Sequence, residues 1–288
     1  MERLLQGALV ANAASLGKNW IYNMSYLKQL AEKESIVFTA IDPAVYKSAG
    51  KSYLAYPRHK IGDFSFQGTL ATWLLKWLKE TPNLTREDYI DRVYEMVQPT
   101  GPYDGYAESY IKTLCFNKLS ELLNTNVEPL VQDDTQLVGF IPYLVVKSLN
   151  QPKENAWELA QAFTNNTIYL AFYNYFDRLL LDLKRRPHKS AIKASLDSVP
   201  NAFKTSFKKA VEMTNTNQFI QDHSGTACGI DDALPLIIHI AYHSTSYEDA
   251  IRKNTIIGGA SSDRGMLLGA LMQYVSDIPQ AWIKQTHM

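Results

Sequence analysis

The chain has 288 residues, of which 46% are hydrophobic and 20% charged, and these fractions are typical of a globular protein with a sizeable core. Lys plus Arg equals Asp plus Glu at 29 each, so no overall field favours nucleic acid or an anionic membrane as a partner. The sequence contains neither an apolar run of about 18 residues nor a secretory leader, which predicts a cytoplasmic protein of unknown oligomeric state.

Helical periodicity dominates the first half of the chain. Apolar residues recur at helical spacing over residues 70–78, which predicts an amphipathic helix. Thr85 followed by Asp88 resembles a capping pair and predicts a helix over residues 86–97. A third helix, with a less regular apolar face, is expected over residues 104–123.

The second half of the chain follows the same pattern. Helices are expected over residues 137–149 and, as one or two elements, over residues 157–183. Ser246 and Asp249 repeat the capping signature before another helix. Alternation typical of a strand occurs only over residues 35–41. With no long linker and no internal repeat, the sequence predicts one compact all-α domain over the whole chain.

Cys115 and Cys228 are far apart in sequence and show no metal-type spacing. We therefore expect both thiols to be reduced and packed.

Near the C-terminus, Gly258 and Gly259 precede small polar residues, and a helix with Gly265 and Gly269 four residues apart follows. Glycine at such positions lets another helix or a ligand approach the backbone closely. The unpaired N–H groups at the start of a helix also favour an anion.

This segment resembles the C-terminal signature of the ADP-ribosylglycohydrolase superfamily, in which Gly-Gly is followed by Asp-x-Asp-Thr and later by Ile-Pro and Trp. Ile278-Pro279 and Trp282 match the later part of that signature. Ala260 and Ser262 stand at the two Asp positions, and Asp263 stands at the Thr position. In the family these acids help to hold two magnesium ions, whereas alanine cannot ligate a hard cation and a serine hydroxyl ligates weakly.

Two N-terminal segments resemble the family with the same losses. Ser65 stands for the first Thr of a Thr-Asp-Asp-Thr motif, but Phe66 and Gln67 replace its two acids. Asn12 stands where the first helix of the family carries an Asp. The resemblance implies an orthogonal multi-helix domain, but the lost acids make magnesium doubtful, and we expect no resident cofactor.

A closer resemblance is to the branch of the family that includes jellyfish J-crystallin and its bacterial relatives. That branch carries an early His-Trp-x-Tyr-Asp element, which residues 19–23 resemble as Asn-Trp-Ile-Tyr-Asn. Ala227-Cys228 before Ala233-Leu234-Pro235 is a second similarity.

The candidate site follows from these segments. Asp63, Asp104 and Asp263 are the candidate catalytic acids, because one carboxylate that holds a sugar hydroxyl and another that acts as general base would suit an N-glycoside. For Asp104, and for Tyr106 and Glu108 after it, a capped and solvated helix start is the alternative. The candidate ligand-binding residues are Asn12, Asn19, Trp20, Tyr22, Ser65, Gln67, Gly258, Gly259, Ser261 and Ser262.

We therefore expect a protein that binds ADP-ribose or a related N-glycoside or nucleotide, with any hydrolysis independent of the usual two magnesium ions. Two alternatives stay open. One is a non-catalytic, crystallin-like or regulatory protein that has kept the fold and lost the chemistry. The other is a glycosidase with a site rebuilt from the three acids. Convergence of Asp63, Asp104 and Asp263 on one cleft favours an enzyme, and dispersed acids favour the non-catalytic protein.

Other polar motifs are expected to be structural. Asp133-Asp134 either caps the following helix or lines a pocket. His239 and His243 have the i,i+4 spacing of zinc ligands but lack a third ligand, so structural histidines are favoured. Asp222-His223-Ser224 is expected in a loop or cap, and Asp231-Asp232 at a helix start.

Overall fold

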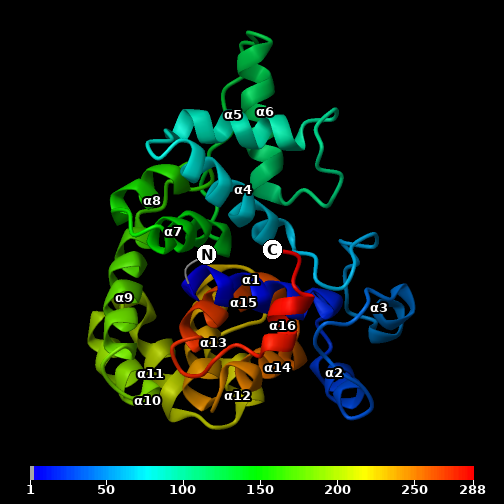
Figure 1. Ribbon diagram of the computed structural model, residues 1–288, viewed down its shortest axis with the longest axis vertical. Coiled ribbons are helices and arrows are strands. Elements are labelled where there is room, and N and C mark those ends of the chain that lie inside the picture. Colours follow the sequence, from blue (N-terminus) through cyan, green and yellow to red (C-terminus); the bar gives the residue numbers. More distant parts are fainter. Residues whose placement is uncertain (1–2) are drawn as a thin grey trace.

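Two helices that cross at the centre of the molecule organise the fold. They are α1 (Arg3–Ser15) and α15 (Ser261–Met272), and all 12 residues of α15 are buried (Figure 1). A helix buried on every side shows no amphipathic stripe, and small residues let its backbone approach a neighbour. A Cβ atom on Gly269 would lie 2.2 Å from the carbonyl oxygen of Gly7. The crossing therefore requires glycine.

The other helices surround this pair in the computed structural model, which describes residues 3–288. Helices α4 to α8 lie above the pair in Figure 1, and α9 to α14 lie below and beside it. Their bounds are α2 (Met24–Ala31), α3 (Pro43–Ala49), α4 (Phe66–Glu80), α5 (Arg86–Val97), α6 (Ser109–Leu122), α7 (Phe140–Ser148), α8 (Lys153–Ala160), α9 (Ile168–Leu183), α10 (His188–Ser195), α11 (Lys204–Glu212), α12 (Thr216–His223), α13 (Ile230–His243), α14 (Tyr247–Ile257) and α16 (Gln280–Gln285). Residues 3–288 contain sixteen α-helices and no strand, so the predicted all-α domain is confirmed.

Helix starts with strong local signals were predicted correctly. The backbone N–H of Asp88 donates to the Thr85 hydroxyl over 3.1 Å, and α5 has the predicted bounds. The Ser246 hydroxyl accepts the equivalent bond from Asp249 N over 3.1 Å at the start of α14. Both caps satisfy N–H groups that a helix cannot pair internally.

Three predicted elements differ from the structure. The helix expected from residue 104 begins only at Ser109, because the Tyr103 hydroxyl donates to the Tyr106 carbonyl and holds this segment as a loop. Residues 35–41 form no strand, since an isolated segment has no neighbour with which to pair. Residues 157–183 divide between α8 and α9, and the helix expected from residue 137 begins as a 3-10 turn.

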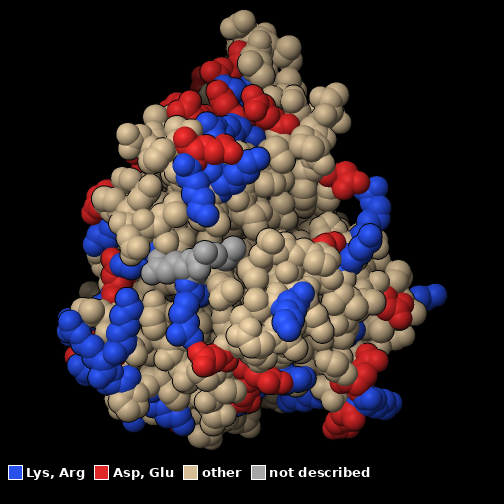
Figure 2. Space-filling model, in the orientation of Figure 1, with Lys and Arg blue, Asp and Glu red and all other residues tan. Residues whose placement is uncertain are grey.

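The surface carries mixed charge. Figure 2 shows Lys and Arg side chains scattered among Asp and Glu side chains on the face in view, without a continuous basic stripe. Across residues 3–288, every helix is too short or too polar to cross a bilayer. Cys115 and Cys228 are free thiols, as predicted.

Candidate functional site

A tight turn leads into α15. Gly258 and Gly259 have φ angles of +79° and +67°, a conformation that side chains rarely adopt. A Cβ atom on Gly259 would lie 2.0 Å from the Thr226 carbonyl oxygen. Gly259 N donates to Ile21 O over 2.8 Å, and Trp20 N donates to Gly259 O over 2.7 Å. The turn is therefore joined to the segment that carries Trp20 and Tyr22.

A buried arginine holds this turn in place by hydrogen bonds. The Arg264 guanidinium donates to Asn254 Oδ1 over 2.7 Å, to Gly258 O over 2.7 Å and to Thr226 O over 3.4 Å. All of these acceptors are uncharged. Burial lowers the pKa of Arg264 to about 10, which leaves it charged at neutral pH. Arg264 therefore places a buried positive charge next to the glycine turn.

A chain of polar side chains joins α1, α4 and α15. The Ser65 hydroxyl donates to Asp263 Oδ1 over 2.7 Å and accepts from Asn12 Nδ2 over 2.7 Å. Asn12 Oδ1 accepts from Ser65 N over 2.9 Å, so the amide and the serine pair twice. Asn12 and Ser65 are fully buried, and Asp263 is 1% exposed. Three separate segments named from the sequence therefore meet at one carboxyl.

The first turn of α15 is held by a second amide. Ser262 N donates to Asn19 Oδ1 over 2.9 Å, and the Ser262 hydroxyl donates to Asn12 O over 3.1 Å. The Asn19 side chain therefore accepts a hydrogen bond from one of the backbone N–H groups at the start of α15. Together with Asn12, it holds the first turn of α15 against α1.

A second buried carboxyl belongs to the same site. Glu108 lies directly before α6, is 3% exposed, and makes no side-chain capping bond to that helix within the described chain. Burial first and the charge of Asp263 second raise the pKa of Glu108 well above its usual range. Burial raises the pKa of Asp263 to about 6, against the hydrogen bond from Ser65 and the charge of Arg264. Burial therefore favours the protonated form of Glu108, whereas Asp263, with a pKa of about 6, is mostly ionised at neutral pH.

Several buried polar atoms of this site have no hydrogen-bond partner within residues 3–288. They are Asp263 Oδ2, Glu108 Oε1, both polar atoms of the Gln67 amide, the Tyr110 hydroxyl, Asn19 Nδ2 and Ser261 Oγ. Gln67 and Tyr110 lie beside Glu108 and partly offset its raised pKa, although neither pairs with the carboxyl in ordinary hydrogen-bond geometry. An unsatisfied buried polar group costs roughly 1–3 kcal/mol. A polar molecule bound at this site could supply the hydrogen-bond partners that these clustered atoms lack.

Phenol rings and one thiol surround the two carboxyls. The charges of Glu108 and Asp263 raise the pKa values of Tyr22, Tyr56 and Cys228, after burial, which is the larger cause. Tyr56 is buried, and its hydroxyl accepts a hydrogen bond from Phe66 N over 3.1 Å. Tyr22 and Cys228 are half-buried, so this side of the site lies nearest to solvent.

Trp20 belongs to an aromatic group beside the site. Its ring lies 5.7 Å from Tyr53, 6.0 Å from Tyr56 and 5.2 Å from Tyr106, measured between centroids. Trp20 is 8% exposed and Tyr53 52% exposed. With a φ of +62°, Trp20 holds an uncommon backbone conformation that its hydrogen bond to the glycine turn maintains.

Asp63 and Asp104 lie apart from the buried carboxyls. Asp63 accepts hydrogen bonds from Lys60 N over 2.7 Å and from His287 Nδ1 over 2.8 Å, and these partners lower its pKa although burial raises it. Asp104 is exposed and pairs with Arg58 at 3.2 Å. Both acids line a surface depression of about 330 Å³ that Asp263 does not line. The structure thus brings Asp63 and Asp104 together at this depression. Asp263 is buried elsewhere and interacts with Glu108.

From the sequence, Glu108 was grouped with Asp104 and Tyr106 either at a capped helix start or near a shared pocket, but it was not among the three candidate catalytic acids. A Glu before a helix usually interacts with the helix dipole, so its position in the sequence does not indicate a buried carboxyl. The available signal was the loop of Pro99, Gly101 and Pro102, which moves the helix start and frees this side chain.

The remaining acidic motifs have local structural roles. Asp134 Oδ1 accepts from Gln136 N over 2.7 Å at the entry to the 3-10 turn before α7. Asp231 and Asp232 lie in the first turn of α13, as predicted, and Ser224 follows the end of α12.

The donor set does not fit two magnesium ions. Ala260 and Phe66 offer no side-chain oxygen, and burial favours the protonated form of Glu108, one of the two buried carboxyls. Residues 3–288 contain no group of three or more His, Cys, Asp or Glu residues that could hold a metal ion. The described residues therefore lack the ligands for a two-magnesium site, and a magnesium-independent reaction stays a prediction.

The fold is similar to that of a solved protein. A chain described as "ADP-ribosylglycohydrolase-related protein complex" matches with a TM-score of 0.57 at 16% sequence identity, over 99% of this chain and 93% of its own. The chain has this ADP-ribosylglycohydrolase-related fold. No family model and no curated protein matches the sequence. At 16% identity the likeness concerns the fold alone, and the likeness to J-crystallin stays a prediction.

Proposed function

We propose that the chain binds ADP-ribose or a related N-glycoside at the buried site between α1, α4, α6 and α15, and that hydrolysis there needs no magnesium. The observation that carries this proposal is the pair of interacting buried carboxyls, Glu108 and Asp263: burial raises the pKa of Glu108 well above its usual range and that of Asp263 to about 6. Two carboxyls held in different protonation states supply a general acid and a general base.

The roles follow from the electrostatics. Protonated Glu108 donates its proton to the leaving nitrogen as the N-glycosidic bond breaks. Ionised Asp263 stabilises the positive charge that develops on the ribose, or takes a proton from the attacking water. Ser65 orients this carboxyl by its bond to Oδ1, so Oδ2 is the oxygen that acts. The Gln67 amide and Asn19 Nδ2 are suited to ribose hydroxyls, which both donate and accept hydrogen bonds.

The aromatic side chains suggest where the ligand enters. Tyr22, Tyr106 and Cys228 combine partial exposure with electrostatic contact to Glu108. A ligand that enters between them would bring its base against Trp20 and Tyr53, since aromatic faces stack on such rings.

A non-catalytic protein is the second candidate. It is favoured by Asp63 and Asp104, which pair with His287 and Arg58 at a surface depression, apart from the buried carboxyls. Such a protein would keep the fold and the binding site without turnover.

Calorimetric titration with ADP-ribose, with and without magnesium, tests the proposal. We expect the wild type to bind ADP-ribose without magnesium. Asp263→Asn and Glu108→Gln should each weaken this binding or abolish turnover. Asp104→Asn is the discriminating variant, and we expect it to bind as the wild type does. Binding that requires magnesium, or that Asp104→Asn alone abolishes, would contradict the assignment. Binding without turnover in every condition would support the non-catalytic protein.

A further inference from the structure

A second cavity, of about 360 Å³, lies between α2, α12, α13 and α14. Four apolar side chains line part of its wall: Met24, Ile240, Ile256 and Ile257. The volume lies at the lower end of the range for small-molecule sites. The cavity is therefore suited to a compact ligand with an apolar body.

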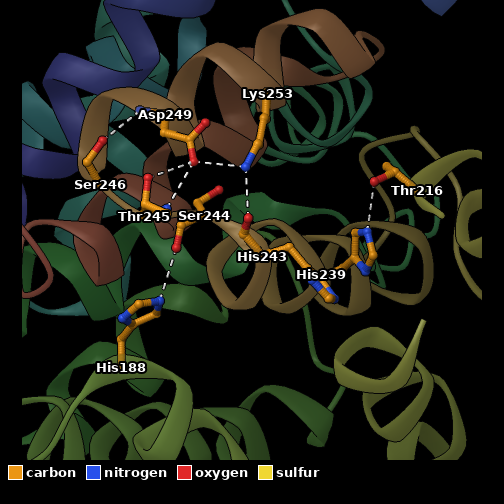
Figure 3. A network of polar contacts seen from close by, with 9 residues as sticks. All are labelled: His188, Thr216, His239, His243, Ser244, Thr245, Ser246, Asp249 and Lys253. Atoms are coloured by element: carbon orange, nitrogen blue, oxygen red, sulfur yellow. Dashed lines mark hydrogen bonds and ion pairs between the residues drawn. The ribbon is translucent and has the colours of Figure 1, made fainter. Parts of the chain in front are cut away.

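His239 forms a rigid, uncharged part of the polar wall (Figure 3). Its Nδ1 lies 2.9 Å from Ala210 O, and a carbonyl only accepts, so Nδ1 carries the proton. Burial lowers the pKa of His239 to about 4, so Nε2 accepts from the Thr216 hydroxyl over 3.0 Å. The ring also stacks on Phe219 with centroids 4.4 Å apart. Because both nitrogens are occupied, His239 is not placed to bind zinc, in agreement with the structural role expected from the sequence.

Two lysines give the cavity its charge. Figure 3 shows Lys253 reaching from α14 to the backbone of α13, where its ammonium donates to His243 O and to Asp249 Oδ2 over 2.8 Å each. Lys28 donates to the uncharged amide of Asn217 over 3.2 Å. Among the described residues, those that line the cavity include no Asp or Glu. With Lys253 balanced by Asp249, one net positive charge faces the cavity.

His243 adds an unsatisfied polar atom to the same wall. Its Nε2 is buried and has no hydrogen-bond partner within residues 3–288. Burial lowers the pKa of His243, against its backbone contacts with Ala210 and Met213, so at pH 7 the ring adds a polar but uncharged group to the wall.

We propose that this cavity binds a small organic monocarboxylate, with its carboxylate at Lys28 and Lys253 and its apolar body against the aliphatic wall. One net charge matches a monoanion better than a phosphate, which carries more charge and no apolar surface. The site is separate from the one proposed to bind ADP-ribose, and it does not depend on that function.

The test uses benzoate as the probe and benzamide as its uncharged analogue, titrated into the full chain at pH 7 by NMR or calorimetry. We expect benzoate to bind at least tenfold more tightly than benzamide. Lys28→Met should weaken benzoate binding at least fivefold, whereas Lys284→Met, at an exposed lysine on α16, should leave it unchanged.

A rim variant tests the location without removing a charge. Thr214→Trp places a large ring at the exposed edge of the cavity and should block benzoate while the melting temperature stays near that of the wild type. Equal binding of benzoate and benzamide, binding insensitive to both Lys28→Met and Thr214→Trp, or tighter binding of inorganic phosphate would each overturn the proposal.

Discussion

The Ser65 hydroxyl donates to Asp263 Oδ1 over 2.7 Å, whereas Oδ2 of the same carboxyl has no hydrogen-bond partner within residues 3–288. One oxygen is thus fixed by the protein, and the other is buried without a partner among the described residues. Ser65 precedes α4 but makes no side-chain cap to that helix. A serine in a capping position therefore serves a carboxyl more than 190 residues away in the chain.

Replacement of Ser65 by alanine should destabilise the protein by roughly 1–3 kcal/mol, because Asp263 Oδ1 and Asn12 Nδ2 both lose a buried partner. The loss of the donated bond should also raise the pKa of Asp263 above about 6. Urea unfolding measures the first effect and carboxyl-carbon NMR the second. Ser25→Ala, at an exposed position on α2, is the matched control and should change stability by less than about 0.5 kcal/mol. An unchanged pKa of Asp263 would show that the hydrogen bond is not formed in solution.

The stability of the protein should depend on pH through Asp263. Its folded-state pKa of about 6 lies above the unfolded value of about 4, so between these values the folded state binds more protons than the unfolded state. The free energy of unfolding therefore falls as pH rises from about 4 to about 6, by an amount on the order of 2 kcal/mol. Glu108, whose pKa burial also raises, acts in the same direction, so Asp263→Asn should reduce this fall without abolishing it. Urea midpoints at pH 4.5, 5.5 and 6.5 for both proteins provide the measurement, and parallel curves would contradict the raised pKa.

Local patterns predicted much of the fold, and long-range packing set the rest. The bounds of α5 follow from Thr85 and Asp88, which lie within one turn of each other. The partnership of Glu108 with Asp263 depends on how the loop before α6 folds across the start of α15, and no periodicity encodes that placement. Asp104 was weighed as the more promising acid of its segment, but the structure directs its side chain to Arg58 at the surface.

The buried charge of Arg264 should be essential for the glycine turn. Arg264→Met removes the donors to Asn254, Gly258 and Thr226 and should destabilise the protein by roughly 3 kcal/mol or more. Arg264→Lys should recover little of this loss, because one ammonium cannot reproduce the planar set of donors. Arg86→Met, at an arginine paired only with its exposed neighbour Glu87, is the control and should cost less than about 0.5 kcal/mol. Thermal unfolding compares the three variants, and near-native stability of Arg264→Met would mean that the turn does not need this charge.

The crossing of α1 and α15 should not tolerate a methyl group. Gly269→Ala would place its Cβ 2.2 Å from Gly7 O and 2.6 Å from the Ala11 Cβ, so the two helices must separate. We expect a loss of about 3 kcal/mol in the free energy of unfolding, because a close-packed interior resists added volume. Gly229→Ala is the matched control: its φ is −64° and a Cβ there meets no described atom within 4 Å, so its stability should change little. Because α15 carries Asp263, a separated crossing should also weaken ADP-ribose binding in Gly269→Ala and not in Gly229→Ala. Equal stability of the two variants in urea would show that the helices cross less closely than 2.2 Å implies.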